Sequence, residues 1–266
     1  MSGTPQTLTF SELDGLGFAA ERGRFDPSAT SYIAADLGPV FELGLLAKSK
    51  TLPWPGNSTW LAMNGIQPLM TALSGRSHQW VCPASRAAGV YRTYATPQED
   101  DLHWVKFGVA LQFVAVSSGF ARNVAAQLVG AIGEMQSNIY EHSQASQTGI
   151  VAFRGRHGTF EFVVCDSGIG VLQSLTSCPD FQGVIDHGEA LQLTLSDGVS
   201  RYGRNSGRGL GFQPLFTGLA NLNGALRFRS GDYALTIEGD NPQSIPARLW
   251  QKPKVQGFLA SVTCRC

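Results

Sequence analysis

The segment from residue 120 onward constrains the fold of this chain more than any other. Over residues 120–142, apolar side chains recur at the spacing of an α-helix, at Val124, Leu128, Ile132, Met135 and Ile139. Further along, the apolar runs at residues 150–153 and 160–165 predict a β-hairpin that turns at residues 155–158. A long amphipathic helix followed by a hairpin predicts a mixed α/β structure.

Composition places the chain among globular proteins and excludes some classes of function. A chain of 266 residues is long enough to bury a core. Its composition, 43% hydrophobic and 15% charged, is typical of globular proteins. The 20 Lys and Arg residues balance the 20 Asp and Glu residues, so the basic surface that sequence-independent nucleic-acid binding needs is not indicated. The five cysteines are odd in number and lack CxxC spacing, which favours neither a disulfide framework nor a zinc site.

The first residues lack a basic segment followed by an apolar one, so we expect no signal peptide. The longest membrane-like run, residues 107–119, is too short to span a bilayer and is followed by Arg122. We expect it to form a buried helix. Together with the cysteine usage, these features predict a cytoplasmic protein without a membrane segment.

Pro53 and Pro55 mark a first break in the chain. A second break lies where Pro97 meets an acidic cluster. We therefore expect a smaller mixed α/β N-terminal domain at residues 1–100 and a second domain at residues 101–266. In the first, residues 41–48 and 60–73 predict helices, and residues 79–82 predict a strand. In the second, the patterns predict helices at residues 189–201 and 212–221 and a closing hairpin formed by residues 225–229 and 233–238.

Polar residues on the predicted long helix form the first pattern with chemical potential. Glu134, Asn138 and His142 are four residues apart and share one helix face. An amide oxygen is a hard neutral ligand for magnesium, and a carboxylate can polarise a water molecule for attack on a phosphate. Taken alone, the set is more simply explained as the solvated face of an amphipathic helix.

The second pattern is Asp166-Ser167-Gly168-Ile169-Gly170, directly after the apolar run at residues 160–165. A carboxylate at the end of a strand can accept a hydrogen bond from an exocyclic amine. Gly168 and Gly170 would let the backbone approach a flat ring closely. A plain turn that closes a strand is the alternative interpretation.

The third pattern is a glycine-rich segment before the predicted helix at residues 212–221. Gly207, Gly209 and Gly211 would expose backbone N–H groups to phosphate oxygens, and Arg204 and Arg208 could add charge-assisted contacts. The segment does not match a dinucleotide-binding fingerprint, because Gly211 falls one place early.

In this order and spacing, the three patterns resemble the nucleotide site of the GHKL ATPases, the family of gyrase, MutL, certain heat-shock chaperones and histidine kinases. The resemblance covers about residues 120–240. Residues 134–143 are similar to the stand-alone bacterial ATP-binding proteins related to histidine kinases and anti-sigma kinases. The resemblance implies a Bergerat-type ATP-binding fold, a two-layer α/β sandwich, in the C-terminal domain. It also implies ATP and magnesium as ligands.

The resemblance further implies a role for each matched residue. Glu134 would activate water or a protein hydroxyl, Asn138 would coordinate magnesium, and Asp166 would bind the adenine amino group. Gly168 and Gly170 would shape the base pocket. Two residues depart from a clear match. His142 could contact a phosphate or simply end the helix, and Thr236, the nearest candidate for a family threonine that holds the aspartate, lacks the preceding glycine. The resemblance also implies a lid at about residues 171–206 that closes over the phosphates. The remaining implied phosphate contacts are Arg204, Gly207, Arg208, Gly209 and Gly211.

Several outcomes remain open at this level. ATP could be hydrolysed or transferred, as in an ATPase or protein kinase, or only bound, as in a conformational switch. A protein-interaction module with a degenerate site is a third interpretation. The N-terminal pattern is faintly similar to STAS-like regulatory domains, and we expect a protein partner or phosphoacceptor. The sequence identifies neither, and it leaves open whether the protein is a homodimer.

Overall fold

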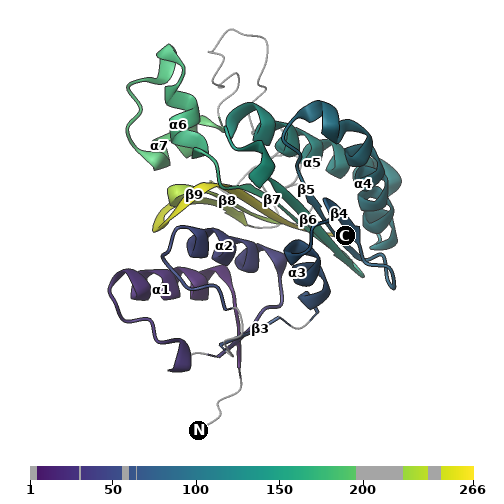
Figure 1. The fold of residues 1–266 in the computed structure, drawn as a ribbon, viewed down its shortest axis with the longest axis horizontal. Helices are drawn as coiled ribbons and strands as arrows, with labels where there is room; N and C mark the ends of the chain where they lie inside the picture. Colours follow the sequence, from purple (N-terminus) through teal and green to yellow (C-terminus); the bar gives the residue numbers. More distant parts are fainter. Residues whose placement is uncertain (1–4, 30, 56–59, 64, 196–223, 239–246) are drawn as a thin grey trace.

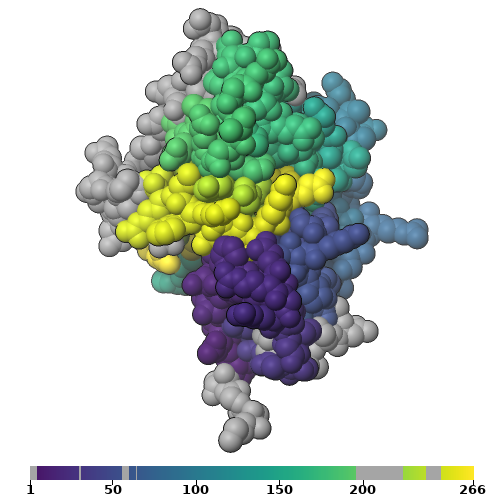
Figure 2. All heavy atoms as spheres, turned by 90° about the vertical axis from the view of Figure 1, so that its left-hand side faces the viewer, coloured from purple at the N-terminus to yellow at the C-terminus, as the bar shows by residue number. Residues whose placement is uncertain are grey.

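The computed structural model describes residues 5–29, 31–55, 60–63, 65–195, 224–238 and 247–266. Within these ranges the protein is a mixed α/β structure with one three-stranded and one six-stranded sheet. Figure 1 shows helices on both sides of the six-stranded sheet, with α1, α2 and α3 on one face and α4 to α7 on the other. In Figure 2 the strands β8 and β9, coloured yellow, form a band between these two groups of helices.

The N-terminal part alternates strands and helices. Its strands pair in parallel in the order β1-β2-β3. Parallel neighbours need a crossover connection, and α1 and α2 provide it. The bounds are Gln6–Thr7 (β1), Phe10–Glu21 (α1), Tyr32–Ile33 (β2), Leu37–Lys48 (α2), Leu61–Ala62 (β3) and Gln67–Ser74 (α3), with a 3-10 turn at Pro27–Ala29.

The six-stranded sheet is antiparallel throughout, in the order β4-β5-β6-β7-β9-β8. Strands β4 to β7 are neighbours in chain order, whereas β9 lies between β7 and β8. The bounds are Gln79–Val81 (β4), Ala88–Arg92 (β5), Ile150–Arg156 (β6), Thr159–Asp166 (β7), Ala225–Glu238 (β8) and Arg248–Arg265 (β9).

Two long helices and two short ones cover the second face of this sheet. The helix α4 begins at Pro97, whose fixed φ angle suits the first helical turn. In the described part of the chain, no helix combines the length and the apolar composition that crossing a membrane requires. The bounds are Pro97–Ser117 (α4), Arg122–His142 (α5), Gly170–Thr176 (α6) and His187–Leu193 (α7), with 3-10 turns at Ser146–Thr148 and Pro179–Phe181.

The central strand β7 explains why both faces of the sheet must be covered. Phe160, Phe162 and Val164 belong to the core formed with α4 and α5, whereas Val163 and Cys165 belong to the core formed with α2. All five side chains are buried. Because successive side chains of a strand point to opposite faces, an apolar run of this kind fits a sheet that is buried on both sides.

A buried ion cluster joins β8 to the N-terminal helices. The Glu42 carboxylate on α2 is fully buried and accepts hydrogen bonds from Nε of Arg227 at 2.7 Å and from Nε of Arg229 at 2.7 Å. Arg227 also contacts Asp14 of α1 at 2.6 Å, and Asp14 lies 2.7 Å from Nζ of Lys252 on β9. Arg227, Arg229 and Lys252 are therefore matched by carboxylates from α1 and α2.

Several sequence predictions are confirmed by these elements. The helix predicted at residues 120–142 is α5, the hairpin predicted before residue 166 is β6-β7, and the strand predicted at residues 79–82 is β4. The run at residues 107–119 is largely helical, as the C-terminal half of α4. Only one of its faces is buried, since Val109 and Phe113 are exposed.

Two predictions were wrong. Residues 60–73 do not form one helix, because the short strand β3 precedes α3. Residues 225–238 do not form a hairpin through Ser230-Gly231-Asp232, because they are the single strand β8, paired with β9. The pairing register shifts at Ser230, Gly231 and Tyr233, and Gly231 has a φ of 59°. The turn-like residues thus lie at an irregularity in the β8-β9 pairing, where Gly231 takes the left-handed conformation that glycine also takes in turns.

Other predictions fall partly or wholly outside the described residues. The helix predicted at residues 189–201 is α7, which ends at Leu193, and residues from 196 onward are not among those described. The helix predicted at residues 212–221 lies outside them altogether. Strands β4 and β5 precede the boundary predicted near residue 100, and β5 pairs with β6, which follows it. The division into two domains stays a prediction.

The ion cluster gives a first prediction about stability. Burial alone would raise the pKa of Glu42, yet the guanidinium groups of Arg227 and Arg229 hold that pKa below its ordinary value. Glu42→Gln removes the counter-charge of Arg229 and one of the two carboxylates that contact Arg227, and we expect it to lower the free energy of unfolding by about 3 kcal/mol. Urea unfolding followed by circular dichroism measures this change.

The matched control is Glu21→Gln at the exposed end of α1, which we expect to change the free energy of unfolding by less than about 0.5 kcal/mol. Equal stability of the two variants would show that the cluster does not hold the sheet to the N-terminal helices.

Candidate functional site

The loop that follows β7 is held in a narrow range of conformations. Asp166 ends the strand with only 2% of its surface exposed, and its Oδ1 accepts a hydrogen bond from the backbone N–H of Gly168 at 2.6 Å. Gly170 has a φ of 74°, a conformation that favours glycine. A Cβ atom at Gly168 would collide with the carbonyl oxygen of Ser143. Both glycines of the motif are therefore required by the backbone itself.

Burial perturbs the Asp166 carboxyl group strongly. It raises the pKa of Asp166 to about 7, against the opposing effects of the Gly168 N–H group and the Lys48 ammonium group. The position of the side chain explains the burial: Asp166 continues the series Phe160, Phe162 and Val164, which faces α4 and α5. The carboxylate thus lies on the face of the sheet that α4 to α7 cover, with one backbone donor from its own loop.

The C-terminal end of α5 packs directly on this loop. The carbonyl oxygen of Ser143 accepts the backbone N–H of Ile169 at 2.9 Å. The neighbouring His142 lies with Nδ1 3.1 Å from Oγ of Ser174 on α6. Asn138, one helical turn earlier, is partly buried. The structure therefore gathers Asp166, Gly168 and Gly170 at the end of α5 that carries His142.

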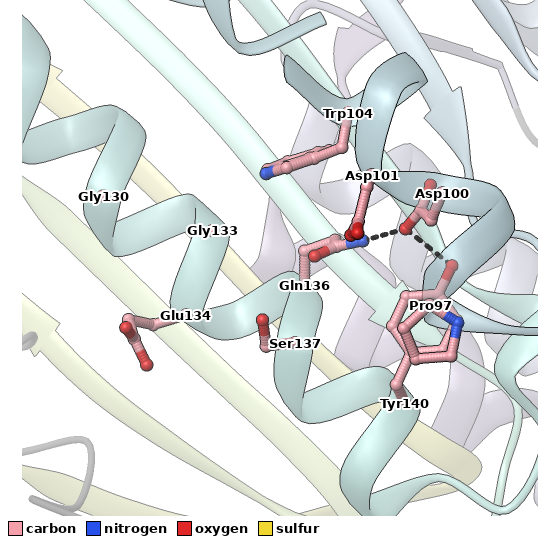
Figure 3. Close-up of a pocket in the computed structure, with 10 residues that line it drawn as sticks. All are labelled: Pro97, Asp100, Asp101, Trp104, Gly130, Gly133, Glu134, Gln136, Ser137 and Tyr140. Carbon is pink, nitrogen blue, oxygen red and sulfur yellow. Dashed lines mark hydrogen bonds between the residues drawn. The ribbon is translucent and has the colours of Figure 1, made fainter.

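Glu134 is exposed, two helical turns before His142. It lines a groove of about 230 Å³ between α4 and α5 (Figure 3). In this view its carboxylate points away from the buried group around Asp100, which accepts hydrogen bonds from Gln136 and, at 2.6 Å, from the Tyr140 hydroxyl. The other lining residues are Pro97, Asp101, Trp104, Gly130, Gly133 and Ser137.

The structure places Thr236 opposite Arg248, six residues beyond Ser230 along β8. The hydroxyl on β8 that contacts the Asp166 loop belongs to Ser230. Its Oγ accepts the backbone N–H of Val171 at 2.9 Å and donates to the carbonyl oxygen of Gly257 at 2.9 Å. Sequence reasoning missed Ser230 because the glycine and aspartate that follow it are typical of a turn.

A second overlooked contact comes from the opposite side of the sheet. The Lys48 ammonium group at the end of α2 donates to Oγ of Ser167 at 2.9 Å. Ser167 also donates its backbone N–H to Oγ1 of Thr148 at 3.0 Å. No local signal in the sequence indicates the Lys48 contact, because 119 residues separate it from Ser167.

The predicted phosphate contacts lie outside the described residues: Arg204, Gly207, Arg208, Gly209 and Gly211. Among the residues that are described, no three His, Cys, Asp or Glu side chains gather as a metal site would require. The partly buried Asn138 carries an amide oxygen, which is a type of ligand that hard cations accept.

Comparison with known proteins adds no information on what these features do. No model of a known protein family matches the chain, and no curated protein matches it.

The raised pKa of Asp166 predicts a pH dependence of stability. The carboxyl group titrates near pH 7 in the folded chain, against an ordinary value of 3.8. The folded state therefore holds an extra proton between about pH 4 and pH 7. The stabilisation linked to this proton is present at low pH and is lost as the pH rises to 7.

Asp166→Asn removes the titrating group and keeps an acceptor oxygen. We expect the stability of the wild type to fall relative to this variant by up to about 1.4 kcal/mol per pH unit in that window. Urea unfolding at several pH values measures the difference, and carboxyl ¹³C NMR measures the pKa directly. A resonance of Asp166 that titrates near pH 4 would contradict the interpretation.

Proposed function

We propose that this protein binds ATP with magnesium between the Asp166 loop and the C-terminal half of α5. We further propose that the six-stranded sheet with α4 to α7 is a Bergerat-type sandwich of the GHKL class. The observation that carries the proposal is Asp166: a buried carboxyl group with a raised pKa, fixed by glycines against the end of the helix that bears Asn138 and His142. Strongly perturbed carboxyl groups of this kind concentrate at functional sites.

Recognition of adenine follows from the state of Asp166. A desolvated carboxylate with a single backbone donor gains from a second donor, and the exocyclic amino group of adenine supplies one. Binding would then lower the pKa of Asp166, because a hydrogen bond to the charged form favours that form. The closely packed backbone at Gly168 and Gly170 would lie beside the flat base.

The phosphates would extend along α5 toward its outer face. Asn138 would supply an amide oxygen to magnesium, and His142, held by Ser174, would donate to a phosphate oxygen. Bound magnesium would neutralise phosphate charge. Arg204 and Arg208, with Gly207, Gly209 and Gly211, would complete the phosphate contacts.

Glu134 decides between two outcomes of binding. As a base, its carboxylate would accept a proton from water or from a protein hydroxyl, giving an ATPase or a protein kinase. Its exposure and its place at the α4–α5 groove favour the second candidate, a conformational switch that binds ATP without turnover, because they leave Glu134 unshielded from solvent. In either case, we propose a cytoplasmic signalling role with a protein partner and a regulatory function for the N-terminal part.

Calorimetry with ATP and magnesium tests binding. We expect Asp166→Ala to weaken the affinity for ATP about ten- to a hundredfold, because a hydrogen bond to a charged group contributes roughly 1.5–3 kcal/mol. Glu21→Ala, on the exposed end of α1, is the control and should bind as the wild type does. The proposal fails if the wild type binds no adenine nucleotide, or if Asp166→Ala binds equally well while folded by circular dichroism.

Release of labelled phosphate tests turnover separately. If the protein is an ATPase or kinase, Glu134→Ala should lower the rate by about a hundredfold or more with little change in affinity, as expected for loss of a general base. Ser137→Ala, the next polar residue on that side of α5, should retain the rate. Binding without phosphate release by the wild type would establish the switch and exclude the enzyme.

A further inference from the structure

The helix α4 is apolar on two opposite sides. One side, with Phe107, Leu111 and Val114, is buried in the core against α5 and the sheet. The other side carries a row of exposed apolar residues, which we call the α4 stripe. Its exposed fractions are 64% for Leu102, 61% for Val105, 65% for Val109 and 56% for Phe113. Spacings of three and four residues align these side chains along one face of the helix.

The neighbouring helix α5 shows what a solvent-facing surface looks like in this protein. Apart from Ala126, its exposed side chains are polar, among them Gln127, Glu134, Ser137 and Glu141. Figure 1 shows α4 at the end of this helical layer, with α5 between it and α6. A contiguous exposed apolar patch of this kind usually marks an interaction site.

The charges beside the α4 stripe indicate its partner. Leu102 and Val109 are seven residues apart and match position a of two successive heptads. Val105 lies between them and matches position d. Asp101 and Lys106 then occupy the flanking g and e positions, which pair across two parallel helices. Both flanking side chains are exposed. An antiparallel pair centred on the stripe would instead bring the two Lys106 side chains together.

We propose that the α4 stripe is the interface of a homodimer, in which α4 packs in parallel against α4 of a second copy. Val109 then meets Val109 of the partner subunit near the dyad, and Asp101 of each subunit pairs with the partner's Lys106. A standard interface buries about 800 Å² on each partner. The stripe spans two heptads at most, so the area that it buries is small by comparison. The dimer is therefore weak, with dissociation in the micromolar range. The proposed dimer forms without bound ATP, so it does not rest on the proposed function.

Sedimentation analysis of the nucleotide-free protein from about 1 to 200 µM tests this dimer. The wild type should pass from monomer to dimer across this range, and Val109→Glu should raise the dissociation constant more than tenfold. Ile185→Glu is the matched control, since Ile185 is an 87% exposed apolar residue outside the stripe and its substitution should change nothing. If Val109→Glu does not fold, Leu102→Glu, near the first turns of α4, serves in its place.

Charge reversal tests the identity and orientation of the partner. Lys106→Glu places a negative charge beside the partner's Asp101 and should weaken the dimer, as should Asp101→Lys. The double variant with both reversals should restore the affinity. A wild type that stays monomeric, a dimer that Val109→Glu leaves intact, or a double variant as weak as either single one would each overturn the proposal.

Discussion

The pairing of Glu42 with Arg227 and Arg229 is the interaction on which the arrangement of this protein depends. Two arginines on an edge strand would be costly to bury without a counter-charge, and α2 supplies it at 2.7 Å to each. The sheet face that carries them therefore requires the N-terminal helices. Strand β8 has no neighbour on its outer side within the sheet order of the described residues, so this cluster helps to fix it in place.

The same helix α2 reaches the candidate nucleotide site. Glu42 lies in its middle, Lys48 at its end contacts Ser167, and the following Ser49 accepts the backbone N–H of Gln256 at 3.1 Å. Ser167 directly follows Asp166, which is the last residue of β7, and Gln256 lies on β9 two residues before Phe258, the partner of Asp166. The helix α2 thus connects the ion cluster to the loop. A displacement of α2 would therefore move the contacts that Lys48 and Ser49 make next to Asp166.

Local patterns in the sequence were sufficient for α5 and the β6-β7 hairpin, because a 21-residue periodic helix and two apolar runs need no distant partner to be recognised. The glycine motif after β7 was found for the same reason. Contacts between distant segments were missed: 185 residues separate Glu42 from Arg227. The false turn at Ser230-Gly231-Asp232 has the same origin, since only pairing with β9 shows that these residues continue a strand.

Under the proposed function, binding and turnover place opposite demands on Asp166 and Glu134. The burial of Asp166 would serve the proposed recognition, because a desolvated acceptor discriminates strongly between a ligand that donates a hydrogen bond and one that does not. Glu134 is exposed, so in this conformation water competes with any substrate proton for its carboxylate. Under the proposed function, recognition of a nucleotide would need no change in this fold, whereas catalysis would require a closure that shields Glu134 from solvent.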